Sequence, residues 1–118
     1  MKALIYDNDL KNLAKLKELL SSIDRFNEIK IVNDDDKFLN IIKNESFDLL
    51  ILEINSDNLK TKMLKMSPAM AQAPTVFISN DTTFLEFKNH KLIQTKDKLK
   101  IMPFLNAITQ LMPDHISD

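Results

Sequence analysis

The chain has 118 residues, of which 44% are hydrophobic and 28% are charged, the balance of one soluble domain. The absence of cysteine excludes disulfides, zinc–thiolate sites and thiol catalysis. No apolar run approaches the ~20 residues that cross a bilayer, and the first residues form no signal peptide, so we expect a cytoplasmic protein without membrane contact. A net charge of −1 gives no overall attraction to nucleic acid.

The chain also contains no glycine, although average usage would supply roughly eight. Glycine-rich phosphate loops and the dinucleotide fingerprint are therefore excluded. Glycine is the usual residue where the backbone needs a positive φ. We expect asparagine and aspartate to take such positions, since they tolerate them best among the other residues.

The first part of the chain predicts two strands, each followed by a helix. Residues 2–6 and 29–32 are the strands. Leucines recur at helical spacing from Asp9 to about Ile23, with Asp9 near the N-cap. The run Asp34–Asp36 should open the second helix, because carboxylates are favourable at a helix N-terminus.

Residues 49–54 then form a run with apolar residues at both odd-numbered and even-numbered positions. Such a run is typical of a strand buried on both faces, which belongs to a parallel sheet covered by helices. Its last residues include one carboxylate, Glu53. In open α/β sheets the functional groups lie at the carboxyl ends of the strands, so Glu53 is the first candidate site residue.

The remaining chain continues the alternation of helix and strand. Methionines at helical spacing predict a third helix, which Pro68 should end or kink. Residues 75–79 and 91–95 predict two more strands, with a short helix at 82–88 between them. A last helix starts around Pro103 and ends before Pro113. We expect residues 1–112 to form one domain and residues 113–118 to be a tail or the start of a linker.

Polar side chains stand at or just beyond the ends of four of the five predicted strands. They are Asp7, Asn8 and Asp9 after the first strand, Glu53 in the third, Ser79 in the fourth and Lys96 beyond the fifth. Because the carboxyl ends of parallel strands meet at one edge of a sheet, these side chains should lie near each other.

This series of strand-end residues resembles the receiver domain of two-component response regulators, and the match spans nearly the whole chain. In that family an acidic triplet follows the first strand, as in Tyr6-Asp7-Asn8-Asp9. The third strand ends in the phosphoacceptor after a pattern similar to Asp48-Leu49-Leu50-Ile51-Leu52-Glu53. Serine or threonine ends the fourth strand, and lysine follows the fifth. The resemblance implies a flavodoxin-like (βα)5 three-layer α/β sandwich with a parallel sheet of order 2-1-3-4-5.

The chain departs from the family's pattern where phosphorylation takes place. Asn8 replaces the second carboxylate, and Glu53 replaces the acceptor aspartate. Glutamate is one methylene longer, which displaces its oxygen by about 1.5 Å, and an error of ~1 Å can cost about a hundredfold in a site that works by positioning. Lys96 is followed by Asp97 where the family has proline. We therefore expect a degenerate receiver whose Glu53 accepts no phosphoryl group.

Three interpretations of the acidic residues stay open. Asp7, Asp9 and Glu53 carry the oxygen ligands that Mg²⁺ prefers and would form a weak Mg²⁺ site, and we expect no other cofactor. Alternatively, the two aspartates cap a helix and Glu53 pairs with Lys96. Glu53 could also imitate a phosphorylated acceptor, although a carboxylate has one charge against nearly two for phosphate.

The resemblance further implies that Ser79, Ile93 and Lys96 occupy the positions of the family's switch residues. A hydroxyl that only caps the next helix is the alternative at Ser79. His90 and His115 have no second ligand at metal spacing. The lysines between residues 88 and 100 have no interleaved aromatic residue for stacking on bases, so we expect no direct nucleic-acid contact.

The sequence thus predicts a signalling module without enzymatic activity. It would act independently of phosphorylation, through a protein partner or a homodimer formed by residues 81–112, with a possible upstream histidine kinase or downstream output domain. One alternative is the receiver half of a DNA-binding transcriptional regulator. Another is a conventional phosphoacceptor receiver that depends on Mg²⁺.

Overall fold

A computed structural model describes residues 1–7, 9–23, 25–53, 73–79, 90–93 and 99–112. Its strands are β1 (Lys2–Tyr6), β2 (Glu28–Val32), β3 (Leu49–Glu53), β4 (Thr75–Ile78) and β5 (His90–Ile93). Its helices are α1 (Leu10–Ser21), α2 (Asp35–Asn44) and α5 (Ile101–Leu111). The helices predicted between β3 and β4 and between β4 and β5 lie outside the described residues, as do residues 113–118.

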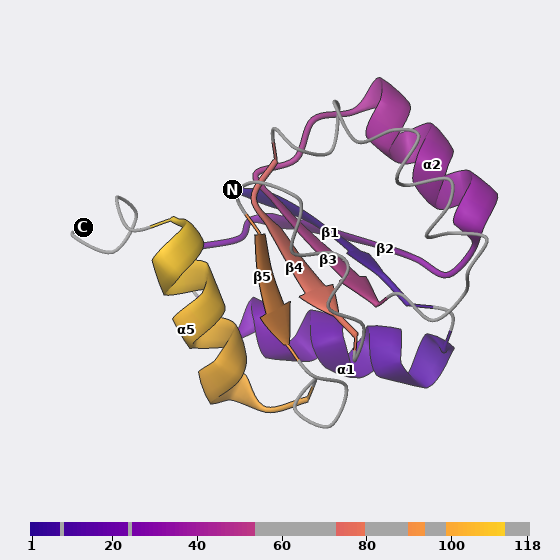
Figure 1. Ribbon diagram of the computed structural model, residues 1–118. Coiled ribbons are helices and arrows are strands. Elements are labelled where there is room, and N and C mark those ends of the chain that lie inside the picture. The colour runs from indigo at the N-terminus through magenta and orange to yellow at the C-terminus, as the bar shows by residue number, and fades with distance from the viewer. Residues whose placement is uncertain (8, 24, 54–72, 80–89, 94–98, 113–118) are drawn as a thin grey trace.

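The five strands form one parallel sheet in the order β2-β1-β3-β4-β5 (Figure 1). This order and direction confirm the prediction from the sequence. Leu4, Ile51 and Val76 lie on the three inner strands and are at most 1% exposed. Strand β3 is buried at all five positions, as its run of apolar residues on both parities predicted.

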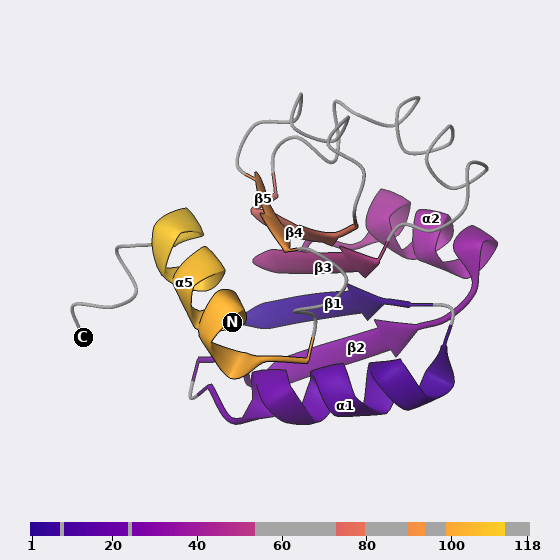
Figure 2. The same cartoon turned by 60° about the horizontal axis from the view of Figure 1, so that its bottom comes forward.

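Helices cover both faces of the sheet, which gives the predicted three layers (Figure 2). On one face, Ala3, Ile5 and Ile51 pack with residues of α1 and α5. On the other face, Leu4, Tyr6 and Leu52 pack around Phe38 of α2. Alternate residues of each strand thus point to opposite faces of the sheet. This alternation decides on which face the side chains just beyond each strand end lie.

Two aspartates begin the first two helices, as predicted. Asp9 Oδ1 accepts a hydrogen bond from the backbone N–H of Lys11 at 2.9 Å, and Asp34 Oδ2 accepts one from that of Lys37 at 3.2 Å. Each bond satisfies an N–H group that has no partner within its helix. Helix α1 ends at Ser21, two residues before the predicted end, and Ile23 packs into the core from the turn that follows.

The ends of the described helices show how the chain manages without glycine there. The cap residues of all three helices have negative φ, from −72° at Ser22 to −133° at Met112. Helices often end instead with a residue of positive φ, which is usually glycine. We expected asparagine and aspartate to supply positive φ, but these helix ends avoid the need for it.

Charged side chains link the start of β1 to β2 and to the end of α2. Lys2 Nζ lies 2.6 Å from Glu45 Oε2 and 3.5 Å from Glu28 Oε2, and Lys30 Nζ lies 2.6 Å from Glu45 Oε1. The ammonium groups of Lys2 and then Lys30 lower the pKa of Glu45. The Glu45 carboxylate in turn raises the pKa of Lys2.

Within the described part of the chain, no helix is long and apolar enough to span a bilayer.

Candidate functional site

The carboxyl ends of β1 and β3 bring two carboxylates to the same level of the sheet. Tyr6 is the register partner of Leu52, so Asp7 and Glu53 are the next pair along these neighbouring strands. Asp7 continues the ladder, since its N–H donates to Val32 O at 3.2 Å. Neighbouring strands lie about 4.8 Å apart, which sets the spacing at which the two side chains leave the backbone.

Both carboxylates belong to the face of the sheet that α1 and α5 cover. Asp7 has the parity of Ala3 and Ile5, and Glu53 has that of Leu49 and Ile51. Asp7 is 1% exposed and Glu53 is 3% exposed. Two buried carboxylates this close would repel each other if both were ionised, so hydrogen bonds or a cation must compensate their charge.

Hydrogen bonds connect Asp7 to the start of α1. Asp7 Oδ1 accepts from the N–H of Asp9 at 2.9 Å, and the Asp9 carboxylate in turn caps the helix. One oxygen of each aspartate is therefore engaged by local backbone, as the capping interpretation requires. Within the residues that the structure describes, no three His, Asp or Glu side chains converge as metal ligands. A weak Mg²⁺ site involving Asp7, Asp9 and Glu53 stays a prediction.

The other predicted site residues are only partly described. Ser79 follows β4, is 3% exposed, and its N–H donates to the carbonyl oxygen of Ile93 at 3.1 Å. Ile93 ends β5 and is 5% exposed within the core. The structure therefore joins the two switch-equivalent positions by backbone. Asn8 and Lys96 lie outside the described residues.

Sequence reasoning missed Tyr6, which lies directly before this acidic group. Its hydroxyl donates to Asp35 Oδ1 in the first turn of α2, and its ring packs against Phe38 with centroids 5.2 Å apart. Burial, followed by the bond to Asp35, raises the pKa of Tyr6. The sequence held an indication of this contact, because the single tyrosine of the chain stands next to Asp7 and three aspartates open the second helix.

Comparison with known proteins identifies the fold that carries this site. No protein-family model matches the sequence, and no curated protein does. The unphosphorylated receiver domain of the stress response regulator RcsB from Escherichia coli superimposes with a TM-score of 0.69 at 14% identity, over 93% of this chain and 92% of that one. The chain has the receiver-domain fold.

Other solved structures share this receiver-domain fold. The two-component transcriptional regulator AraC from Clostridium phytofermentans gives a TM-score of 0.67 at 17% identity, over 98% of both chains. The RcsB response regulator of Salmonella typhimurium, in a structure concerned with DNA interaction, gives 0.66 at 15% identity. The alignment covers 93% of the present chain but only 59% of that regulator.

Proposed function

We propose that this chain is a receiver-type module of two-component signal transduction that works without phosphorylation, by contact with a protein partner or a second copy. The observation that carries the proposal is Glu53 at the carboxyl end of the central strand, where the resemblance puts an acceptor aspartate. It is buried beside Asp7 and belongs to a sheet with the receiver order of strands. The fold is thus retained around a group of the wrong length for the transfer.

Exposed apolar side chains support the contact part of this proposal. Leu99, Ile101 and Met102, at and before the first turn of α5, are 40%, 37% and 58% exposed. They belong to the range 81–112 that we predicted as the contact surface. Apolar side chains that gather on a surface mark sites of protein interaction more often than singly scattered ones do.

Two other functions compete with this one. The present chain spans 59% of the Salmonella regulator whose structure concerns DNA interaction. This coverage favours, as second candidate, the receiver half of a DNA-binding regulator, whose output domain rather than this domain would contact DNA. The third candidate is a conventional receiver that is phosphorylated on an acidic side chain with Mg²⁺ bound.

The test of phosphorylation independence is labelling with acetyl phosphate in the presence and absence of Mg²⁺, read by mass spectrometry. We expect no added phosphate on the natural chain, because the longer side chain of Glu53 misplaces the attacking oxygen. The matched variant carries both Glu53→Asp and Asn8→Asp, which restores the family's pattern, and it should gain label. Addition of one phosphate at Glu53 that depends on Mg²⁺ would establish the third candidate instead.

A further inference from the structure

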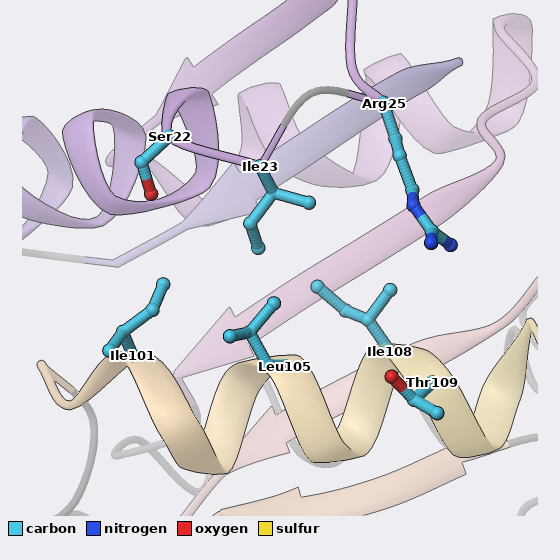
Figure 3. A pocket seen from close by; sticks show the side chains of 7 residues that line it. All are labelled: Ser22, Ile23, Arg25, Ile101, Leu105, Ile108 and Thr109. Carbon is cyan, nitrogen blue, oxygen red and sulfur yellow. The ribbon is translucent and has the colours of Figure 1, made fainter. Parts of the chain in front are cut away.

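A hollow lies between the end of α1 and the length of α5 (Figure 3). Its volume is about 290 Å³. Ile23 points into it from the turn after α1, and Leu105 and Ile108 point into it from α5. Its middle is therefore apolar. A hollow of this size is at the lower end of the ~300–1,000 Å³ typical of ligand sites, so its occupant would be small.

One end of the hollow carries a cation. The guanidinium of Arg25 points across the gap toward Ile108 and Thr109, and the Arg25 residue is half-buried (Figure 3). In the described part of the chain, the ion pairs within 4 Å join other residues, around Lys2 and Glu45. A partly desolvated guanidinium favours a carboxylate, which it binds through two parallel hydrogen bonds.

The other end of the hollow continues into a second one. Ser22 and Ile101 line both hollows, and the second, of about 510 Å³, adds Leu19 and Leu99 together with the charged residues Lys15 and Glu18 of α1. Apolar side chains of α5 therefore line the hollows from the Arg25 end to the first residue of the helix. An occupant with its charge at Arg25 would have room for an unbranched apolar chain in that direction.

We propose that this groove binds a medium-chain carboxylate, with the carboxylate on Arg25 and the alkyl chain along Ile23, Leu105 and Ile101. The Thr109 hydroxyl lies at the same end of the hollow as the guanidinium and offers a further donor. The apolar walls gain from burial of the alkyl chain, and the guanidinium fixes its direction. This site is separate from the acidic edge of the sheet and does not depend on the proposed function.

The test is titration of the natural chain with octanoate, followed by calorimetry and by amide shifts in NMR spectra. Binding should shift resonances at residues 19–25 and 99–109. Arg25→Gln should weaken binding by about tenfold to a hundredfold, the range expected for loss of a charge-assisted hydrogen bond. The matched control is Lys17→Gln, which removes an exposed cation of α1 that lines neither hollow and should leave the affinity unchanged.

Octanol provides a second control, because it has the same alkyl chain without the charge. It should bind the natural chain and Arg25→Gln equally weakly. Absence of octanoate binding at low millimolar concentrations would overturn the proposal, and so would equal octanoate affinity for Arg25→Gln and the natural chain. Unfolding curves of Arg25→Gln and Lys17→Gln test whether each variant is folded. The backbone oxygen of Arg25 accepts a hydrogen bond from the Met1 amino group, and substitution of the side chain leaves that oxygen in place.

Discussion

Tyr6 connects β1 to α2, two elements that lie far apart in the sequence. It ends β1, and its hydroxyl reaches Asp35 in the first turn of α2. A buried phenol that donates to a carboxylate is held in its neutral form. The residue next to the acidic pair is therefore fixed by a bond to the opposite layer of the fold, which restricts how the end of β1 can move.

The first prediction uses the fact that the chain has one tyrosine and no tryptophan. Ultraviolet titration of the native chain should show no phenolate until the protein unfolds in alkali, because the folded pKa of Tyr6 is raised above its ordinary value. The stability linked to this group is complete below the unfolded pKa, about 10, and is lost as the pH rises toward the folded pKa. Tyr6→Phe keeps the ring contact and should cost about 1–3 kcal/mol, as loss of a hydrogen bond to a charged group does. Phenolate formation near pH 10 in the folded chain would contradict this.

The second prediction concerns Glu53 and Lys96. Glu53 lies buried beside Asp7, so a cation should offset their combined charge. If Lys96 is that cation, Lys96→Met should destabilise the domain by roughly 1–3 kcal/mol. Glu53→Gln should cost less, because it also removes the repulsion between the two carboxylates.

Urea unfolding of both single variants and of the double variant measures the coupling. If the two losses simply add, Glu53 and Lys96 do not interact. Measuring self-association of Glu53→Gln in the same samples tests whether the carboxylate acts as a standing signal. A changed dimer affinity at unchanged stability would favour that interpretation.

At the scale of elements, the paired strands and capped helices followed from local patterns. The apolar run 49–54 indicated a strand buried on both faces, and Asp9 and Asp34 stand where a capping side chain satisfies free N–H groups. The contacts that the sequence did not predict are long-range. Lys2 meets Glu45 only because β1 and the end of α2 come together in the folded chain, and no local spacing encodes that meeting.

For the candidate site, the sequence predicted which residues stand at strand ends but not their depth or register. That Asp7 and Glu53 are level follows from the pairing of Tyr6 with Leu52, which is fixed by packing of whole strands. The groove at Arg25 was missed for a similar reason, since it forms between the turn after α1 and the distant helix α5.

The third prediction concerns the acid dependence of the link among Lys2, Lys30 and Glu45. The pKa of Glu45 is lowered in the folded chain, so its contribution is present above the unfolded pKa and is lost as the pH falls through the folded pKa. Glu45→Gln should therefore lower stability at neutral pH and flatten the acid side of the stability profile. Asp36→Asn, which changes an exposed carboxylate of the first turn of α2, is the comparison. Parallel profiles for the natural chain and Glu45→Gln from pH 7 to pH 3 would contradict the prediction.

At the scale of the whole molecule, the two proposals share part of one face. Leu99 and Ile101 belong to the proposed contact surface at the start of α5 and also line the groove between α1 and α5. A ligand in the groove would therefore touch the border of the contact surface. Any dimerisation assay should be carried out with defatted protein, so that the two effects are measured separately.

The fourth prediction is that Met102→Glu weakens self-association by at least about tenfold, because a charge in an apolar contact costs its desolvation. Leu10→Glu is the matched control. Leu10 is also exposed, at 64% against 58% for Met102, and both residues lie in the first turn of a helix, where an acidic side chain favours folding. Analytical ultracentrifugation measures both. Equal dimer affinities of Met102→Glu and the natural chain would place the contact outside the start of α5. If the natural chain is a monomer at all concentrations, the contact surface would have to bind a different protein.

The helix ends with negative φ have a consequence for the unfolded chain rather than for the folded one. Every glycine exchanged for another residue at a position that tolerates the exchange reduces the freedom of the denatured polypeptide, with a gain of about 0.4–1 kcal/mol. A chain without glycine has a smaller denatured ensemble than one of average composition. Part of what keeps this small domain folded therefore comes from no contact in it.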